Sequence, residues 1–173
     1  MQTKNFMHYT ADELIQYYGL QQHPEGGHYK ETYRSREFIP HAALPKKFKD
    51  SRNYATAIYF LLERGSFSAF HRIKSDECWH FYAGGRLNIY VIHLNGELET
   101  IFLGNDIANG ETFQSVVPAG SWFASEPAIN TLFSFVGCTV APGFDFEDFE
   151  LAKAEELILQ YPQHTDLIKR LTR

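Results

Sequence analysis

Short apolar runs separated by turn residues fill the chain from residue 53 to residue 140, and the turns recur roughly every eight to twelve positions. In one run Leu87, Ile89 and Val91 alternate with other residues, which is the period of a β-strand. That run leads to Asn95-Gly96, a dipeptide that strongly favours a tight hairpin turn. β-Branched and aromatic residues dominate the region, and no helical period competes there. We therefore expect an all-β sandwich or barrel with a core spanning about residues 28–141.

The two ends of the chain carry helical signals instead. Thr10 and Glu13 have the spacing of a capping box, and Gly19 supplies a C-terminal stop, so we expect a short helix over residues 11–18. After Pro142-Gly143 the apolar residues adopt a helical period that is interrupted at Pro162. This pattern predicts two short amphipathic helices within about residues 146–172, covering one open side of the sheet.

The composition limits the class of protein. A chain of 173 residues that is 44% hydrophobic can form one full core, so we expect a single domain over residues 1–173. The formal net charge is −5 and there is no long run of Lys or Arg, which argues against a nucleic-acid partner. The first residues lack the apolar segment of a secretory signal, and no apolar run approaches the roughly 20 residues of a membrane span. We expect a cytoplasmic protein without a membrane partner.

The stretch from residue 65 to residue 84 contains the most specific chemistry. Residues two apart share one face of a strand, so Ala69, His71 and Ile73 should point the same way. A polar turn at residues 74–76 should then bring Glu77 back towards His71. We expect these two side chains to form a buried pair, which either serves a pocket or is merely structural, since buried polar groups normally find partners.

A resemblance to a known family follows from these residues. Gly65, His71, Glu77 and Gly84 match most of the first cupin motif, Gly-x5-His-x-His-x3-Glu-x6-Gly, although Ile73 replaces its second histidine. Longer segments in the same order resemble the cupin 5 family, also called DUF985. These segments are His-Pro-Glu-Gly-Gly (23–27), Glu31-Thr-Tyr-Arg34, Thr56-Ala-Ile-Tyr-Phe-Leu-Leu62, Phe70-His-Arg-Ile-Lys-Ser-Asp-Glu77, Trp79-His-Phe-Tyr82, Val117-Pro-Ala-Gly120 and Val140-Ala-Pro-Gly-Phe-Asp145.

The resemblance implies a double-stranded β-helix, which is a small jelly-roll barrel that holds a ligand inside. It also implies a homodimer formed through the barrel strands. The expected partners are therefore a small-molecule ligand and a second copy of the chain. The family does not supply a reaction, because its biochemical role is largely unassigned.

The resemblance also bears on metal binding. The usual cupin site takes two histidines and a glutamate from the first motif and one histidine from the second. Here only His71 and Glu77 stand at ligand positions, and Phe123 occupies the position in the second motif. Catalytic metals usually have three protein ligands, so we expect no cofactor. The alternative is a divalent metal held by His71 and Glu77 in a degenerate site.

The favoured hypothesis is a metal-free pocket for a small polar or sugar-like molecule. His71 would act as acid and base, and Glu77 would fix its tautomer and raise its basicity. Tyr82 is the expected proton donor, with Tyr29 and Tyr33 as further candidates. By analogy with metal-free cupins that epimerise nucleotide-linked sugars, such a site suits an epimerase or isomerase. A non-catalytic binding module and a barrel plugged by side chains are the alternatives.

Further residues are expected to contact the ligand. Large aromatic rings should form the walls of the pocket, although rings of this size also serve core packing. Guanidinium groups suit a carboxylate or phosphate, although they also occur as ordinary surface cations. The expected ligand-binding residues, partly taken from the family segments, are Glu31, Tyr33, Arg34, Arg72, Trp79, Trp122, Phe123 and Asp145.

Overall fold

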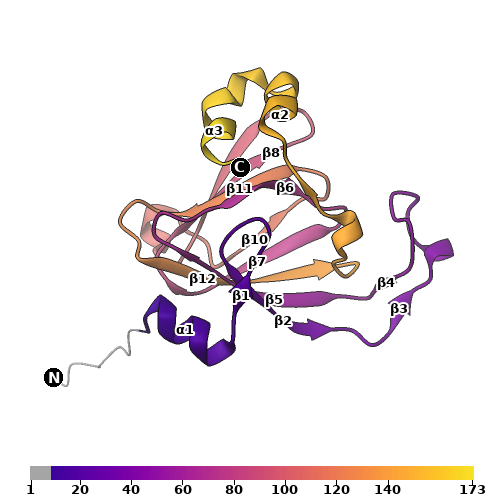
Figure 1. Ribbon diagram of the computed structural model, residues 1–173, viewed down its shortest axis with the longest axis horizontal. Coiled ribbons are helices and arrows are strands. Elements are labelled where there is room, and N and C mark those ends of the chain that lie inside the picture. The colour runs from indigo at the N-terminus through magenta and orange to yellow at the C-terminus, as the bar shows by residue number, and fades with distance from the viewer. Residues whose placement is uncertain (1–8) are drawn as a thin grey trace.

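Two antiparallel sheets face each other in the computed structural model, which describes residues 9–173 (Figure 1). The N-terminal segment from which we argued against a secretory signal lies outside the described residues. The first sheet has the order β1 (Gln21–Gln22), β2 (His28–Arg34), β5 (Thr56–Glu63), β12 (Phe133–Ala141), β7 (Asp76–Gly84) and β10 (Gln114–Val117). The second has the order β13 (Glu150–Leu151), β6 (Ser68–Arg72), β11 (Trp122–Pro127), β8 (Leu87–Ile92) and β9 (Leu98–Leu103).

The connections between strands alternate between the two sheets. The chain passes from β5 to β6, then to β7, to the β8–β9 hairpin, to β10, to β11 and back to β12. The turn of that hairpin contains Gly96 at a φ of 85°, as the Asn95-Gly96 signal indicated. This crossing pattern is a jelly roll, so the all-β barrel expected from the sequence is confirmed.

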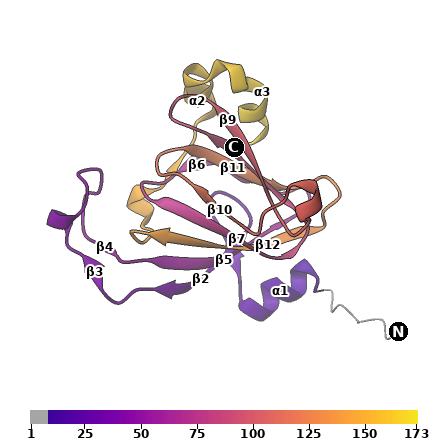
Figure 2. The same ribbon diagram turned by 180° about the vertical axis from the view of Figure 1, so that it is seen from behind.

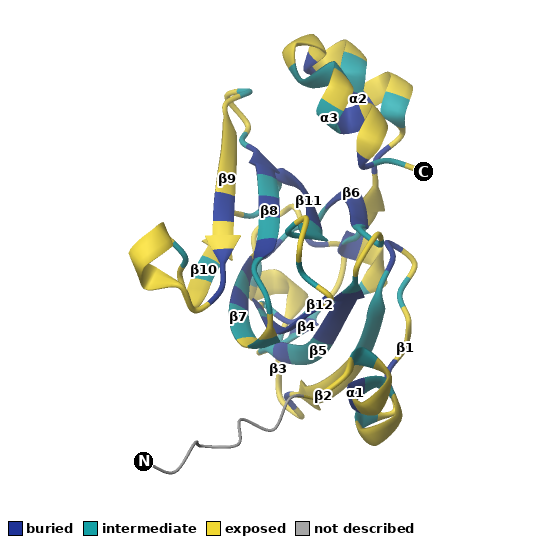
Figure 3. Ribbon diagram, turned by 90° about the vertical axis from the view of Figure 1, so that its left-hand side faces the viewer, coloured by how far each residue is buried: buried dark blue, intermediate teal, exposed yellow. Residues whose placement is uncertain are grey.

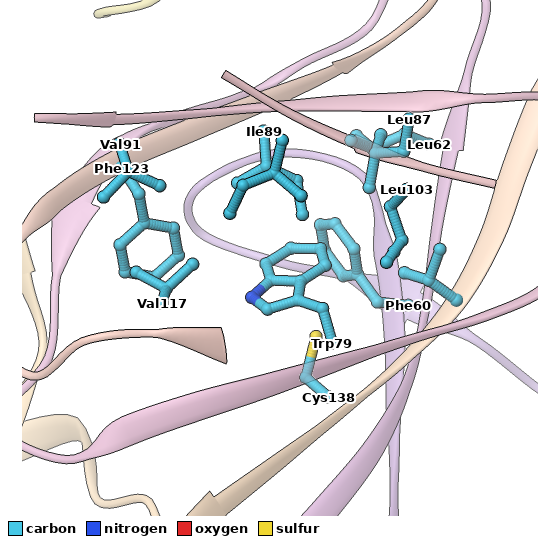
Figure 4. Close-up of a cluster of buried hydrophobic side chains, with 12 residues drawn as sticks. Phe60, Leu62, Trp79, Leu87, Ile89, Val91, Leu103, Val117, Phe123 and Cys138 are labelled. Carbon is cyan, nitrogen blue, oxygen red and sulfur yellow. The ribbon is translucent and has the colours of Figure 1, made fainter. Parts of the chain in front are cut away.

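The space between the sheets contains the main hydrophobic core. Trp79 is 1% exposed and packs edge to face against Phe60, with ring centroids 5.9 Å apart. Ile89 and Leu103 of the second sheet belong to the same buried cluster, and Figure 4 shows Ile89 next to this indole. Full burial of such side chains stabilises the fold by roughly 1.5–3 kcal/mol each, so this cluster is the main link between the sheets.

Helix α1 (Ala11–Tyr18) covers part of the outer face of the first sheet (Figure 1). Its capping box is present, because the amide of Glu13 donates to Thr10 and the amide of Thr10 donates to the Glu13 carboxylate. Gly19 ends the helix in the left-handed conformation. Leu14 belongs to the same buried cluster as Leu61 of β5 and Phe135 of β12. The apolar outer side of β5 is therefore covered from within the chain.

The C-terminal helices cover the outer face of the second sheet, as Figures 1 and 2 show. α2 (Ala154–Gln160) and α3 (Thr165–Arg170) are separated by a short 3-10 turn that begins at Pro162. Leu157 and Ile168 face inwards and pack with Phe70 and Trp122 of the sheet. In Figure 3 the outer sides of both helices are exposed. Among residues 9–173, no helix has the length and apolar character that a membrane crossing requires.

Two smaller features position the site. β3 (Phe38–Ile39) pairs with β4 (Arg52–Asn53) next to β5 (Figure 2). A 3-10 turn (His41–Ala43) lies between them. After the segment that Arg52 of β4 holds through Asp148, β13 pairs with β6 in the register Leu151 to His71. This short strand leads the chain from the barrel into α2.

Candidate functional site

A cavity of about 140 Å³ lies between the sheets. Strands β2, β5, β7 and β12 of the first sheet line one side of it, and β6 contributes from the second sheet. Two further segments complete the wall: residues 21–25, which begin with β1, and residues 144–149, which follow β12. Cavities of about 150 Å³ admit molecules as large as benzene, so there is room for a small ligand or part of one. The acids and histidines that line the cavity are His23, Glu25, Glu31, His71 and Glu77.

His71 lies on β6 and is 3% exposed, and both of its ring nitrogens have protein partners. Nδ1 is 2.8 Å from the carbonyl oxygen of Ala69, so Nδ1 carries a proton and donates it there. Nε2 is 3.1 Å from Oε2 of Glu25. The expected pairing of His71 with Glu77 was therefore wrong. Glu77 lies on the opposite sheet, and the partner comes from the segment that precedes β2.

The protonation of this pair follows from its burial. Burial lowers the pKa of His71 to about 4, and burial also raises the pKa of Glu25. With Nδ1 already a donor, a neutral His71 presents the lone pair of Nε2 to Glu25. Both shifts favour the uncharged forms, a neutral imidazole and a protonated carboxyl. We expected a neighbouring carboxylate to raise the basicity of His71, but desolvation lowers its pKa and only the bond to the Ala69 carbonyl opposes the shift.

A tight turn at residues 23–27 delivers Glu25 to this position. Gly27 has a φ of 75°, and a Cβ there would lie 2.7 Å from the carbonyl oxygen of Leu61, so the turn requires glycine. The hydroxyl of Ser68 donates to Oε1 of Glu25 over 2.9 Å. These contacts hold the carboxyl against β6, and so they fix the orientation of the His71 ring.

Glu77 reaches the cavity from β7 and is 8% exposed. Burial raises its pKa to about 8, and the nearby charge of Glu25 adds to the rise. Cys138 and Trp79 lie beside the carboxyl and favour its ionised form, but they do not outweigh burial. The indole N–H of Trp79 has no hydrogen-bond partner of good geometry in residues 9–173. No cation pairs with Glu77 in this part of the chain, so it is a largely protonated acid at neutral pH.

Aromatic rings form much of the remaining wall. Trp79 and Phe60 contribute from the first sheet, and Phe144, Phe146 and Phe149 contribute from the segment after β12. That segment is anchored by a buried ion pair between Arg52 and Asp148, with nitrogen-to-oxygen distances of 2.6 and 2.8 Å. Lys74 adds a third contact to Asp148 at 3.0 Å. The aromatic segment is thus held from outside the cavity by charged groups.

Arg34 and Glu31 line the cavity as an ion pair. The guanidinium donates from Nε and Nη2 to the two carboxylate oxygens over 3.0 and 2.7 Å. Its Nη1 donates to Oδ1 of Asn53 and to the carbonyl oxygen of Phe144. We expected both residues at the pocket, and both line the cavity. The N–H donors of Arg34, however, are bonded to other groups of the protein.

Two of the three candidate tyrosines do not reach the cavity. Tyr82 is 51% exposed and packs outside the first sheet against Tyr59 and Phe135. Strand alternation already places it on the face opposite Glu77. Tyr33 is exposed because a β-bulge between Glu31 and Tyr33 turns it away. Tyr29 does line the cavity, so it replaces Tyr82 as the candidate phenol.

Four other expected contacts lie elsewhere. Arg72 pairs with Glu150 over 2.7 Å and lies over the ring of Trp122, beneath the C-terminal helices. Asp145 caps a short 3-10 turn by accepting from the amide of Glu147. Phe123 packs against the ring of His71, with centroids 4.0 Å apart, but does not line the cavity. Arg72, Trp122, Phe123 and Asp145 are therefore supporting residues.

The donor groups do not fit a cupin metal site. Nδ1 of His71 is bonded to the Ala69 carbonyl, and its Nε2 lies beside a single carboxylate, that of Glu25, rather than beside Glu77. In residues 9–173, no three side chains among His, Cys, Asp and Glu converge as a cation site. We therefore derive no chemistry from a metal at this position.

A jelly-roll barrel with an internal pocket is an architecture that cupins share with some other proteins. More specifically, the chain belongs to the family described as Cupin superfamily (DUF985), whose model matches residues 12–152. The resemblance seen in the sequence is thereby confirmed. The family establishes the fold without naming a reaction.

Relatives match this chain over most of its length. An uncharacterized protein of Saccharomyces cerevisiae is 32% identical over 160 residues, which is 85% of this chain and 77% of the relative. A crystal structure from Shewanella oneidensis is 45% identical, with a TM-score of 0.85 over 95% of this chain and 98% of the other. A hypothetical protein from Leishmania major is 33% identical, with the same TM-score over 95% and 99%. Oxalate decarboxylase from Bacillus subtilis, at 13% identity and a TM-score of 0.53 over 87% of this chain and 36% of the other, shares the fold alone.

Proposed function

We propose that the protein binds a small polar, sugar-like molecule in the cavity and transfers a proton within it, as an isomerase or epimerase does. One observation carries the proposal. Two separate proton carriers, Glu77 and the His71–Glu25 pair, face one cavity with aromatic walls. Titratable groups whose pKa values are strongly shifted in a cleft are typical of acid–base sites.

The proposed step uses the two carriers in turn. The ionised fraction of Glu77 removes a proton from the carbon next to a carbonyl group. A protonated Glu25, next to His71, gives its proton to the carbonyl oxygen, which leaves a neutral enol and an ionised Glu25. Glu77 then returns its proton to the adjacent carbon, and Glu25 takes the proton of the enol hydroxyl that becomes the new carbonyl group. Both carboxyl groups end in their starting states, so protons and charge balance without a redox cofactor. A pKa of about 8 suits Glu77 to this role, because effective general bases titrate near the working pH.

The test has two stages. First, a thermal-shift screen of aldoses, ketoses, lactones and sugar derivatives identifies a ligand, because a molecule that binds only the folded state raises its stability. Second, NMR in D₂O follows deuterium incorporation next to the carbonyl of that ligand. We expect enzyme-dependent exchange that is lost in Glu77→Gln and strongly reduced in His71→Gln. Tyr82→Phe serves as the matched control outside the cavity. Exchange that persists in Glu77→Gln would refute the assigned role.

One observation favours a non-catalytic binding module as the second candidate. Nδ1 of His71 is bonded to Ala69 and Nε2 lies 3.1 Å from Oε2 of Glu25, so a ligand competes with Glu25 for the one remaining ring nitrogen. A binding module would show the thermal shift without deuterium exchange. The NMR stage therefore separates the two functions.

A further inference from the structure

Resting on the proposed function, we infer that the group bound in the cavity is an uncharged polyhydroxy carbonyl compound, and that carboxylates and phosphates are excluded. The inference concerns substrate class and follows from the charges that line the cavity. Three carboxyl groups, those of Glu25, Glu31 and Glu77, face it. Among the described lining residues, Arg34 is the one arginine or lysine.

Arg34 cannot serve as the counter-ion of a ligand, because its donors are already used. Glu31 takes two of its N–H groups in a bidentate pair, with oxygens 3.0 and 2.7 Å away. Asn53 and the carbonyl oxygen of Phe144 take two more, at 3.0 and 3.1 Å. Four of the five N–H groups of a guanidinium are thus satisfied, and its charge is neutralised by Glu31.

The two histidines of the cavity add no positive charge at neutral pH. Burial lowers the pKa of both His23 and His71. Neutral imidazoles leave the Glu25 carboxyl without a cationic partner among the lining residues. An anionic ligand would therefore lose its hydration, meet no free cation and lie near carboxyl groups, an arrangement that is strongly unfavourable in a buried site.

The lining suits an uncharged ligand in two further ways. A protonated Glu77 presents one O–H donor and one carbonyl acceptor, which match the hydroxyl and carbonyl groups of a sugar. The faces of Trp79, Phe144 and Phe149 offer apolar surface for the C–H groups of a sugar ring. A ligand ammonium group would first require Glu77 to lose its proton, which opposes binding at pH 7.

Matched sets of compounds test the inference by isothermal titration calorimetry at pH 7. Each set contains a neutral sugar, its uronate, its 6-phosphate and its 2-amino derivative, for glucose, galactose and mannose. We expect the neutral member of the set that binds to be at least about tenfold tighter than its charged members, which corresponds to ~1.4 kcal/mol. A uronate, phosphate or amino sugar that binds more tightly overturns the inference and leaves the proposed function standing. Failure of every neutral and charged compound here and in the thermal-shift screen would instead overturn the proposed function itself.

A substitution tests the electrostatic reasoning directly. Glu31→Gln removes the carboxylate that neutralises Arg34, so uronate binding should improve by about tenfold relative to binding of the neutral sugar. Glu150→Gln is the matched control, because it frees Arg72 in the same way outside the cavity. Thermal unfolding of both variants confirms that they are folded. Equal uronate affinity in Glu31→Gln and the unaltered protein would overturn the argument that the paired arginine excludes anions.

Discussion

Replacing Glu77 with glutamine should change how the stability of the protein depends on pH. Burial raises the pKa of Glu77 from its ordinary value of 4.5 to about 8. Between these two pH values the folded chain keeps a proton that the unfolded chain has lost, so stability falls as pH rises through this window. Glutamine has nearly the shape of a protonated glutamate and cannot ionise. The variant should therefore lack this part of the pH dependence.

The range from pH 6.5 to pH 8 isolates the effect best. Burial lowers the pKa of His71 from 6.5 to about 4, so its contribution to stability rises with pH in that interval and is constant above it. A carboxyl with the two pKa values of Glu77 loses about 2 kcal/mol of stability between pH 6.5 and pH 8. Glu77→Gln should therefore lose about 2 kcal/mol less than the unaltered protein across this range.

Urea unfolding followed by tryptophan fluorescence measures this difference at several pH values. The matched control is Glu37→Gln, which removes an exposed glutamate and should leave the pH profile parallel to that of the unaltered protein. Taking differences between profiles removes the contribution of the His71–Glu25 pair. Parallel profiles for Glu77→Gln and the unaltered protein would refute the claim that this carboxyl is protonated in the folded state.

Three further predictions follow from other contacts. Tyr29→Phe should weaken ligand binding roughly fivefold, the value of one hydrogen bond of about 1 kcal/mol, whereas Tyr82→Phe should not change it in the same calorimetric titration. Arg52→Met should lower the free energy of unfolding by about 3 kcal/mol in urea, because it leaves the buried Asp148 with Lys74 alone, and Arg52→Met/Asp148→Leu should recover most of the loss. Gly137→Ala should cost about 1–3 kcal/mol, because the new Cβ overlaps the ring of Tyr82, and the cost should nearly vanish in a Tyr82→Ala background.

Local signals in the sequence were sufficient for much of the fold. The capping box at Thr10 and the glycine at position 19 defined α1, since both act through neighbouring backbone groups. Pro162 separated the C-terminal helices because it cannot continue α2. Strand alternation correctly placed His71 with Ile73 on the cavity side of the second sheet. Each of these features depends on residues only a few positions apart.

The arrangement of the site depended on contacts that local patterns do not specify. Glu25 reaches His71 across 46 positions of sequence, through a turn whose course is set by packing against β5 and β6. Its presence in the family segment at residues 23–27 was the one available signal. The β-bulge after Glu31 reversed the faces of Tyr33 and Arg34, and a one-residue shift of this kind leaves no clear mark in composition. Phe144 and Phe149 line the cavity from a segment whose residues follow neither a strand nor a helix period, so the sequence did not predict their positions.

The two-residue strand β13 has a consequence for any attempt to shorten the chain. It occupies the free side of β6, the strand that carries His71, while β11 occupies the other side. The amide of Ala152 and the carbonyl oxygen of Leu171 also bond to Phe70 there. A chain cut before residue 150 would leave β6 as an open edge whose unpaired backbone groups can recruit a strand from another copy. Removal of residues 150–173 should therefore cause aggregation, which would prevent a measurement of ligand binding.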